Sequence, residues 1–138
     1  MKPVFQTKFG DKHGNCMVAC VASLLELPLS AVPEFGFDQK QWQINLLAFL
    51  RQYGLGWQCI NYDFYENHPY LAPHGYVILT GPNAQGVNHA VVGVSDEHGI
   101  RMVHNPNPNC SGLTKIISVD LITVAQPHLV ASLHGVKA

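Results

Sequence analysis

The stretch GNCMVACVASLLELPLSAVPEF, residues 14–35, decides how this chain of 138 residues begins to fold. From Cys16 to Pro28 it contains no Gly and is rich in Ala and Leu, which favour a helix. Asn15 is a residue type common at helix N-caps, and Pro28 interrupts the pattern. Only two residues between Cys16 and Pro28 are polar. We therefore expect a buried helix with Cys16 in its first turn.

A second helix is predicted over residues 39–53, QKQWQINLLAFLRQY, with Asp38 as its cap and Gly54 as its stop. Its apolar residues recur at helical spacing and define one buried stripe: Trp42, Leu46, Phe49, Leu50 and Tyr53. The pattern is amphipathic, so this helix should pack by one face.

The second half of the chain changes to short β-type runs separated by Gly, Pro and Asn. The predicted strands are WQCINY (57–62), YVILT (76–80), NHAVVGV (88–94), IRMVHN (100–105) and KIISVDLITV (115–124). Residues 95–99, SDEHG, fit a hairpin turn. Helices followed by consecutive strands predict an α+β fold, with the N-terminal helix packed on an antiparallel sheet. Since there are no repeats or linker-like tracts, we expect residues 1–138 to form a single domain.

Charge and hydropathy exclude several classes of function. Only 12% of residues are charged, the formal net charge is -1 and no run of like charge occurs, so neither nucleic acid nor an anionic membrane is an expected partner. The N-terminal residues lack a signal-like apolar stretch, and no segment has the length of a membrane span. We therefore expect a cytoplasmic protein whose four cysteines are reduced thiols.

Cys16 is the first candidate for chemistry because of its expected place at a helix start. The partial positive charge and free N–H groups of a helix N-terminus stabilise a thiolate and lower the pKa of a thiol. Gly14 lets the backbone turn sharply before the helix, which frees the Cys16 N–H to face a substrate oxyanion. The alternative is that Cys16 is a small buried apolar residue, as most helix cysteines are.

A cysteine nucleophile needs an imidazole base, and the base needs a group that orients it. His89 is predicted at the start of one strand, and Asn105 at the end of the next. In an antiparallel pair these two ends lie side by side, so Asn105 can accept a hydrogen bond from His89. Each histidine, taken alone, is more often an ordinary surface or core side chain.

Taken together, residues 14–35, NHAVVGV and VHNPNP resemble the papain-like cysteine peptidase superfamily. The likeness is greatest to small peptidase-like proteins of bacteria and phages related to the double-glycine leader peptidases. It implies that Cys16 is the nucleophile, His89 the general base and acid, and Asn105 the orienting residue. It also implies a Gln before the cysteine that completes the oxyanion hole. The usual position, six residues ahead, is Gly10 here, and the candidate is Gln6, ten residues ahead.

These residues predict hydrolysis of a peptide or amide bond through a thioester, with no cofactor. The expected partner is a peptide or protein substrate, and the irregular stretch from Asn61 to Gly75 is where we expect its recognition. One alternative is a binding module that keeps the fold without catalysis. Another is a zinc site, whose possible ligands are His13, Cys16 and Cys20 with His89, His104 or Cys110. In the enzyme reading Cys20 and Cys59 are inward-facing packing residues.

Overall fold

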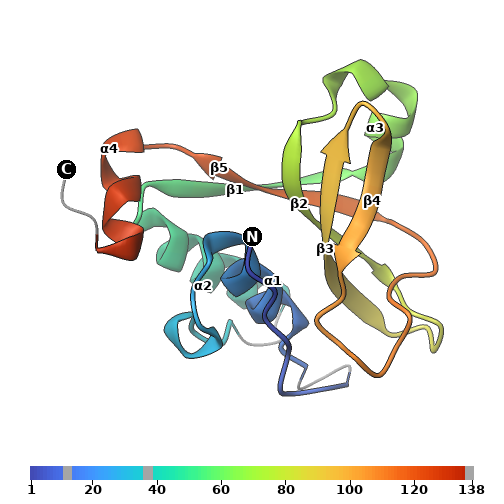
Figure 1. The fold of residues 1–138 in the computed structure, drawn as a ribbon, viewed down its shortest axis with the longest axis horizontal. Helices are drawn as coiled ribbons and strands as arrows, with labels where there is room; N and C mark the ends of the chain where they lie inside the picture. Colours follow the sequence, from blue (N-terminus) through green and yellow to red (C-terminus); the bar gives the residue numbers. More distant parts are fainter. Residues whose placement is uncertain (11–13, 36–38, 136–138) are drawn as a thin grey trace.

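A computed structural model describes residues 1–10, 14–35 and 39–135, and Figure 1 shows their arrangement. The α-helices are α1 (Cys16–Leu25), α2 (Gln39–Arg51), α3 (Tyr62–Asn67) and α4 (Pro127–Val130). Single 3₁₀ turns span Leu29–Ala31, Pro69–Leu71 and Ala131–His134. The strands are β1 (Leu55–Asn61), β2 (Gly75–Pro82), β3 (Asn88–Asp96), β4 (Gly99–His104) and β5 (Ser118–Val124).

The five strands form one antiparallel sheet in the order β1-β5-β2-β3-β4. The last strand, β5, therefore lies between β1 and β2, and its centre pairs with a strand at each edge. Asp120 of β5 is in register with Cys59 of β1 and with Ile78 of β2. At the other side of the sheet, Gly81 of β2 is opposite His89 of β3. The register fixes which side chains share a face of the sheet, because neighbours along a strand alternate.

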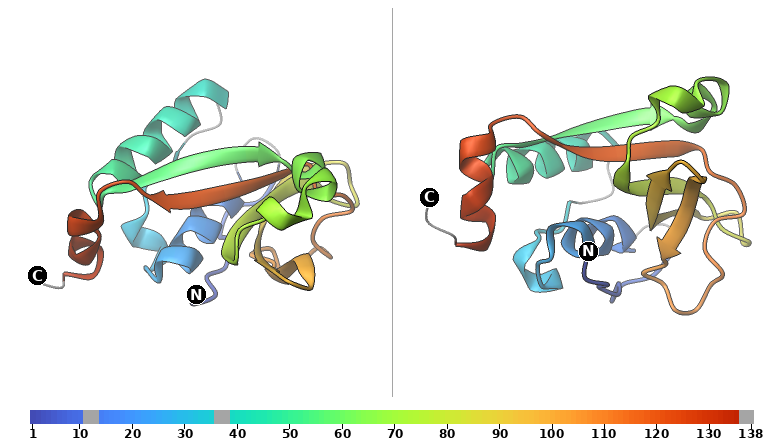
Figure 2. Two further views of the ribbon diagram at one scale, coloured as in Figure 1. Left: turned by 90° about the horizontal axis from the view of Figure 1, so that it is seen from above. Right: turned by 45° about the horizontal axis from the view of Figure 1, so that its top comes forward.

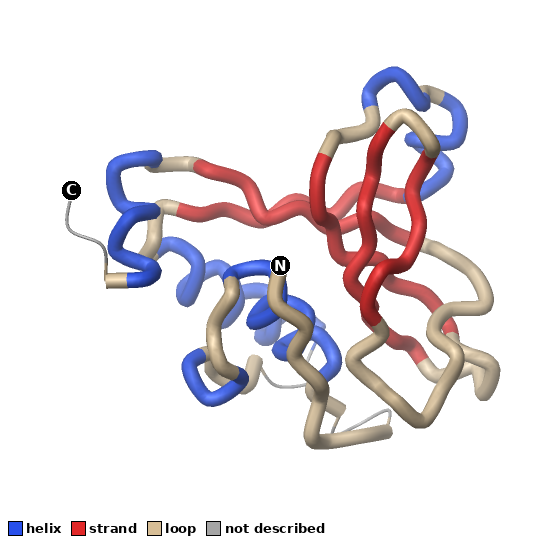
Figure 3. Tube along the Cα trace, viewed as in Figure 1, coloured by secondary structure: helices blue, strands red, loops and turns tan. Residues whose placement is uncertain are grey.

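Two buried clusters lie on opposite faces of the sheet. The first core joins α1 and α2 to one face, and its members include Val21, Leu46, Leu50, Ile78 and Val92. The second core joins α3 to the other face, and its buried members are Tyr65, Val77, Leu79, Val91 and Val119. Figures 2 and 3 show α1 and α2 gathered beside the sheet and α3 at its far end.

Helix α1 is buried because its apolar residues surround it on nearly every side, as the sequence predicted. Ala19, Cys20, Val21 and Ala22 have no solvent exposure. The helix ends where Glu26 adopts a left-handed conformation, with φ of 57°, two residues before Pro28. Its central position makes the start of α1 a rigid support for Cys16.

The first residues of the chain run along α1 and reach the end of β4. The N–H of Val4 donates to Ser23 Oγ at 2.9 Å, and His104 Nε2 donates to the Val4 carbonyl at 2.8 Å. Two residues further, the N–H of Gln6 donates to the Pro106 carbonyl at 3.0 Å. These bonds hold Gln6 close to the segment that contains Asn105.

The expected fold is confirmed at the level of α+β, with the N-terminal helix on an antiparallel sheet. All five strands are present, with edges shifted by up to three residues, and the 95–99 turn joins β3 to β4. Tyr62 begins α3 instead of ending β1, and α2 ends at Arg51, three residues before Gly54. The predicted cap, Asp38, lies outside the described residues. No helix in the described ranges has the length and apolar character needed to cross a bilayer.

Candidate active site

A cavity of about 300 Å³ lies at the N-terminal end of α1, against β3 and β5. The predicted residues Cys16, His89 and Gln6 line it together. Further polar side chains in its wall come from the two central strands and from nearby loops: Thr80, Asn83, Asn107, Ser118 and Asp120. Apolar wall is supplied by Met17, Val18, Phe35, Trp42 and Val87. The cavity therefore combines a thiol, an imidazole and a carboxyl group with an apolar lining.

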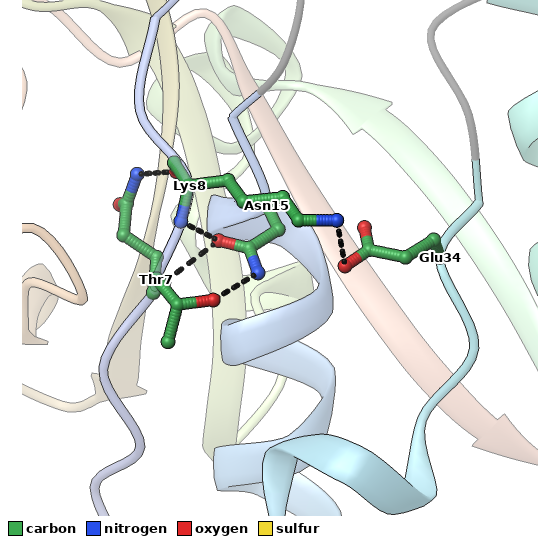
Figure 4. A network of polar contacts seen from close by, with 5 residues as sticks. Thr7, Lys8, Asn15 and Glu34 are labelled. Atoms are coloured by element: carbon green, nitrogen blue, oxygen red, sulfur yellow. Dashed lines mark hydrogen bonds and ion pairs between the residues drawn. The ribbon is translucent and has the colours of Figure 1, made fainter.

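Cys16 is the first residue of α1, as the sequence predicted, but Asn15 does not cap this helix with its side chain. Instead, Asn15 Oδ1 accepts hydrogen bonds from the N–H groups of Thr7 at 3.0 Å and Lys8 at 2.9 Å. Figure 4 shows this network, which continues through an ion pair between Lys8 and Glu34 at 3.3 Å. Asn15 thus ties the N-terminal segment to α1 and leaves the first N–H groups of the helix without a side-chain cap.

The environment of the Cys16 thiol differs from the expectation of a lowered pKa. Burial raises the pKa of this thiol above its ordinary value of 9.0, and the nearby Cys110 adds a smaller increase. Main-chain hydrogen bonds at Ala90, Met17 and Cys16 itself act in the opposite direction. The helix start contributes as expected, but desolvation is larger. Cys16 is therefore a thiol in the resting protein and needs a base to become a nucleophile.

His89 and Asn105 form the hydrogen bond that the strand ends predicted, with 2.8 Å between His89 Nε2 and Asn105 Oδ1. The orientation of the Asn105 amide is fixed from both sides. Its Oδ1 also accepts from the N–H of Asn107 at 3.1 Å, and its Nδ2 donates to the Cys110 carbonyl at 2.8 Å.

This fixed amide determines the tautomer of the imidazole. Because Oδ1 can only accept, His89 Nε2 must carry the proton. In the neutral ring Nδ1 is then the unprotonated nitrogen, which is able to take up a proton. The Cys16 thiol lies beside the main chain of Ala90, the residue that follows His89.

Gln6 lies in the wall of the cavity despite its unusual distance from Cys16 in sequence. Its side chain is 6% exposed, and Nε2 donates one hydrogen bond to the Lys8 carbonyl at 2.9 Å. Its Oε1 is buried without a hydrogen-bond partner in the described part of the chain. One Nε2 hydrogen is thus taken, and the second is the one that an oxyanion hole would use.

The sequence reasoning missed Asp120, which is 2% exposed in the middle of β5. Burial raises the pKa of this carboxyl group to about 6, whereas hydrogen bonds from Cys59 and Ser118 lower it. Ser118 in turn is hydrogen-bonded to Thr80. An available signal was the alternation in KIISVDLITV, which places one acidic residue among the inward positions of an apolar strand.

All four cysteines are free thiols. Of the three besides Cys16, one lies in the core, one beside the cavity and one in a loop. Cys20 is fully buried in the first core, as expected, but Cys59 is exposed on the cavity side instead of packed. Asp120 and burial together raise the pKa of Cys59 to about 11, with burial the larger cause. Among the described residues no group of three or more metal-ligating side chains is brought together. His13, named in the zinc alternative, lies outside the described residues.

Taken together, an imidazole, a thiol and the uncapped start of α1 line the same cavity. This is the set of groups that acyl transfer through a cysteine requires. Comparisons of the chain with protein-family models, with curated proteins and with solved structures found no match.

Proposed function

We propose that this protein is a papain-like cysteine hydrolase that cleaves a peptide or amide bond, acting in the cytoplasm. The observation that carries the proposal is the hydrogen bond from His89 Nε2 to the fixed Oδ1 of Asn105. It leaves Nδ1 as a base in the wall of the cavity that Cys16 also lines. The coarse architecture, a buried helix with the cysteine at its start on an antiparallel sheet, supports the same reading.

The reaction begins when His89 Nδ1 accepts the proton of the Cys16 thiol. The sulfur attacks the carbonyl carbon, and the oxyanion is stabilised by the main-chain N–H of Cys16 and by the second hydrogen of Gln6 Nε2. The imidazolium then gives its proton to the leaving amine as the C–N bond breaks. Water, activated by the same imidazole, hydrolyses the thioester and releases the acid. Asn105 holds the ring throughout without changing its own charge.

A second candidate is a binding module that retains the fold without catalysis. The observation that favours it is that burial raises the pKa of the Cys16 thiol, which opposes a resting thiolate. The two functions differ in one measurable property. In the hydrolase the reactivity of Cys16 depends on His89, and in the binding module it does not.

The test is the rate at which iodoacetamide labels each cysteine across pH 6 to 10, followed by peptide mass mapping. In the unaltered protein Cys16 should be labelled faster than the other three thiols near pH 7. In His89→Ala that rate should fall by about 100-fold, the usual contribution of a positioned base. Labelling of the variant should recover only above pH 9, because the thiol then ionises with its own raised pKa.

His104→Gln is the matched control, since His104 is as buried as His89 but is bonded to the Val4 carbonyl outside the cavity wall. It should leave the pH profile of Cys16 unchanged. Equal labelling of Cys16 and Cys110, with no response to His89→Ala, would instead identify the binding module.

A further inference from the structure

The cavity contains a buried carboxylate that the proposed reaction does not use. Asp120 projects from β5 into the wall that also contains Cys16 and His89, and it is 2% exposed. The reaction needs a nucleophile, a base and an orienting residue, and these roles are already filled. Asp120 is therefore available for another task in the same cavity.

The partners of Asp120 are neutral. Ser118 Oγ lies 3.5 Å from Oδ1, and the Cys59 thiol supplies a second hydrogen bond. None of the ion pairs among the described residues includes Asp120. A carboxylate that is buried without a positive partner is costly to keep ionised. Yet burial raises its pKa only to about 6, so at neutral pH the group is mostly charged.

The wall of the cavity contains a second carboxylate besides Asp120. Within the described ranges the cavity is lined by two carboxylates, Asp120 and Glu34, and by no Lys or Arg. Glu34 is exposed and paired with Lys8, so among the described residues Asp120 is the lining carboxylate without a cationic partner. Another acceptor in the same wall, Oε1 of Gln6, is also without a hydrogen-bond partner among these residues. Among the described residues the wall thus adds negative charge at Asp120 and an open acceptor at Gln6 to the N–H donors at the start of α1.

The apolar part of the lining fits the stem of a long cationic side chain. Phe35, Trp42 and Met17 line the cavity together with Asp120. Lys and Arg bury their methylene groups against such surfaces while the charged tip seeks a carboxylate. An aromatic wall adds attraction for a cation.

We propose that Asp120 forms the base of a recognition pocket for a positively charged side chain of the substrate, a lysine-type ammonium or an arginine-type guanidinium. This proposal adds a substrate preference to the proposed hydrolase function and depends on that function. The ammonium or guanidinium donates to the Asp120 carboxylate, and its stem packs on the aromatic wall. The scissile carbonyl is thereby presented to Cys16.

The first experiment compares two irreversible probes that alkylate the Cys16 sulfur, an N-acetyl-lysyl and an N-acetyl-norleucyl chloromethyl ketone. They share the warhead and the aliphatic stem and differ in the ammonium group. In the unaltered protein the lysyl probe should react about tenfold faster, as one nearby opposite charge predicts. In Asp120→Asn the ratio of the two rates should fall to about one.

Glu97→Gln is the matched control, because it removes the same charge from an exposed hairpin turn away from the cavity. Its rate ratio should equal that of the unaltered protein. An unchanged ratio in Asp120→Asn, or an equal loss in both variants, would overturn the recognition pocket. The iodoacetamide profile of His89→Ala tests the nucleophile separately, so the two failures are distinguishable.

A second experiment removes the need for a reactive thiol. In Cys16→Ala, pentylammonium and pentanol are titrated while the backbone NMR signals of Trp42, Ser118 and Asp120 are followed. Pentylammonium should bind at least about fivefold more tightly than pentanol, and the added Asp120→Asn substitution should abolish the difference. Equal binding of the two probes in Cys16→Ala would refute the proposal even if the hydrolase function holds.

Discussion

Asp120 contributes to the pH dependence of stability, because the fold favours the neutral form of its carboxyl group although the group is mostly ionised at neutral pH. Its folded pKa of about 6 lies above the ordinary 3.8, so the folded state holds the proton more tightly than the unfolded chain. The stabilisation of the fold by the proton bound to Asp120 is complete below pH 4 and is lost as the pH rises through 6. The ionised group therefore costs up to roughly 3 kcal/mol at pH 7.5.

Asp120→Asn removes that cost while keeping the size of the side chain and one acceptor oxygen. We expect its free energy of unfolding at pH 7.5 to exceed that of the unaltered protein by up to about 3 kcal/mol. The difference should shrink steadily between pH 6 and pH 4. Urea denaturation at pH 4, 5, 6 and 7.5 measures it, and a pH-independent difference would contradict the assignment of the buried charge.

In the proposed reaction Asn105 acts only through the ring that it holds, so it is a positioning residue. Asn105→Ala removes the acceptor of the His89 Nε2 proton, and that proton should then exchange freely with water. We expect the NMR signal of this proton to be sharp in the unaltered protein and to disappear in Asn105→Ala, and labelling of Cys16 at pH 7 to slow by about tenfold.

Asn105→Asp is the conservative comparison because it keeps an acceptor at the same place. It should retain the ring N–H signal of His89 even though it loses the donor to the Cys110 carbonyl. If Asn105→Ala keeps that signal, then another group orients the imidazole.

At the scale of the elements, the end of β2 is the most constrained point near the site. A Cβ atom on Gly81 would lie 2.0 Å from the Lys115 carbonyl oxygen, and Ile117 N–H donates to Thr80 there at 2.8 Å. Gly81→Ala must therefore displace main chain opposite His89 and should destabilise the fold by about 1–3 kcal/mol.

Gly56→Ala in β1 is a suitable control for that substitution. The new methyl group would meet only the side-chain oxygen of Thr123, which can rotate away. Thermal unfolding should show a clearly lower midpoint for Gly81→Ala than for Gly56→Ala. Equal midpoints would mean that the 115–117 segment yields easily, and that β2 does not fix the place of His89.

The elements were also the part of the fold that sequence patterns predicted well. Helix α1 follows from a run without Gly between Cys16 and Pro28, and β3 with β4 follows from apolar runs joined by a turn. Both are local signals. The insertion of β5 between β1 and β2 is a choice of partners distant in sequence, which no local pattern encodes.

The difference between local signals and distant contacts also separates the site residues that were predicted from those that were missed. His89 and Asn105 come from neighbouring strands of one hairpin, so their approach followed from antiparallel geometry. Asp120 reaches the cavity only because β5 crosses to the centre of the sheet. Likewise, the raised pKa of Cys16 depends on burial by segments far along the chain, and the helix start alone predicts the opposite sign.

For the whole molecule, the sheet connects the first core to the second. β5 contributes Val119 to the second core and Ile122 to the edge of the first. We expect the two cores to unfold together in urea. Fluorescence of Trp42 and Trp57 reports the first core, and the methyl NMR signals of Val77 and Val91 report the second. Separate midpoints for the two sets of signals would show two independent units.

The bond between Gln6 and Pro106 joins residues one hundred positions apart, and Asp120 enters the cavity wall later still. During synthesis the thiol emerges from the ribosome long before its imidazole, its orienting amide or its carboxylate neighbour. The cavity is therefore not assembled until β5 has been made and inserted between β1 and β2. The proposed hydrolase activity can therefore appear only after β5 has left the ribosome and paired with its neighbours.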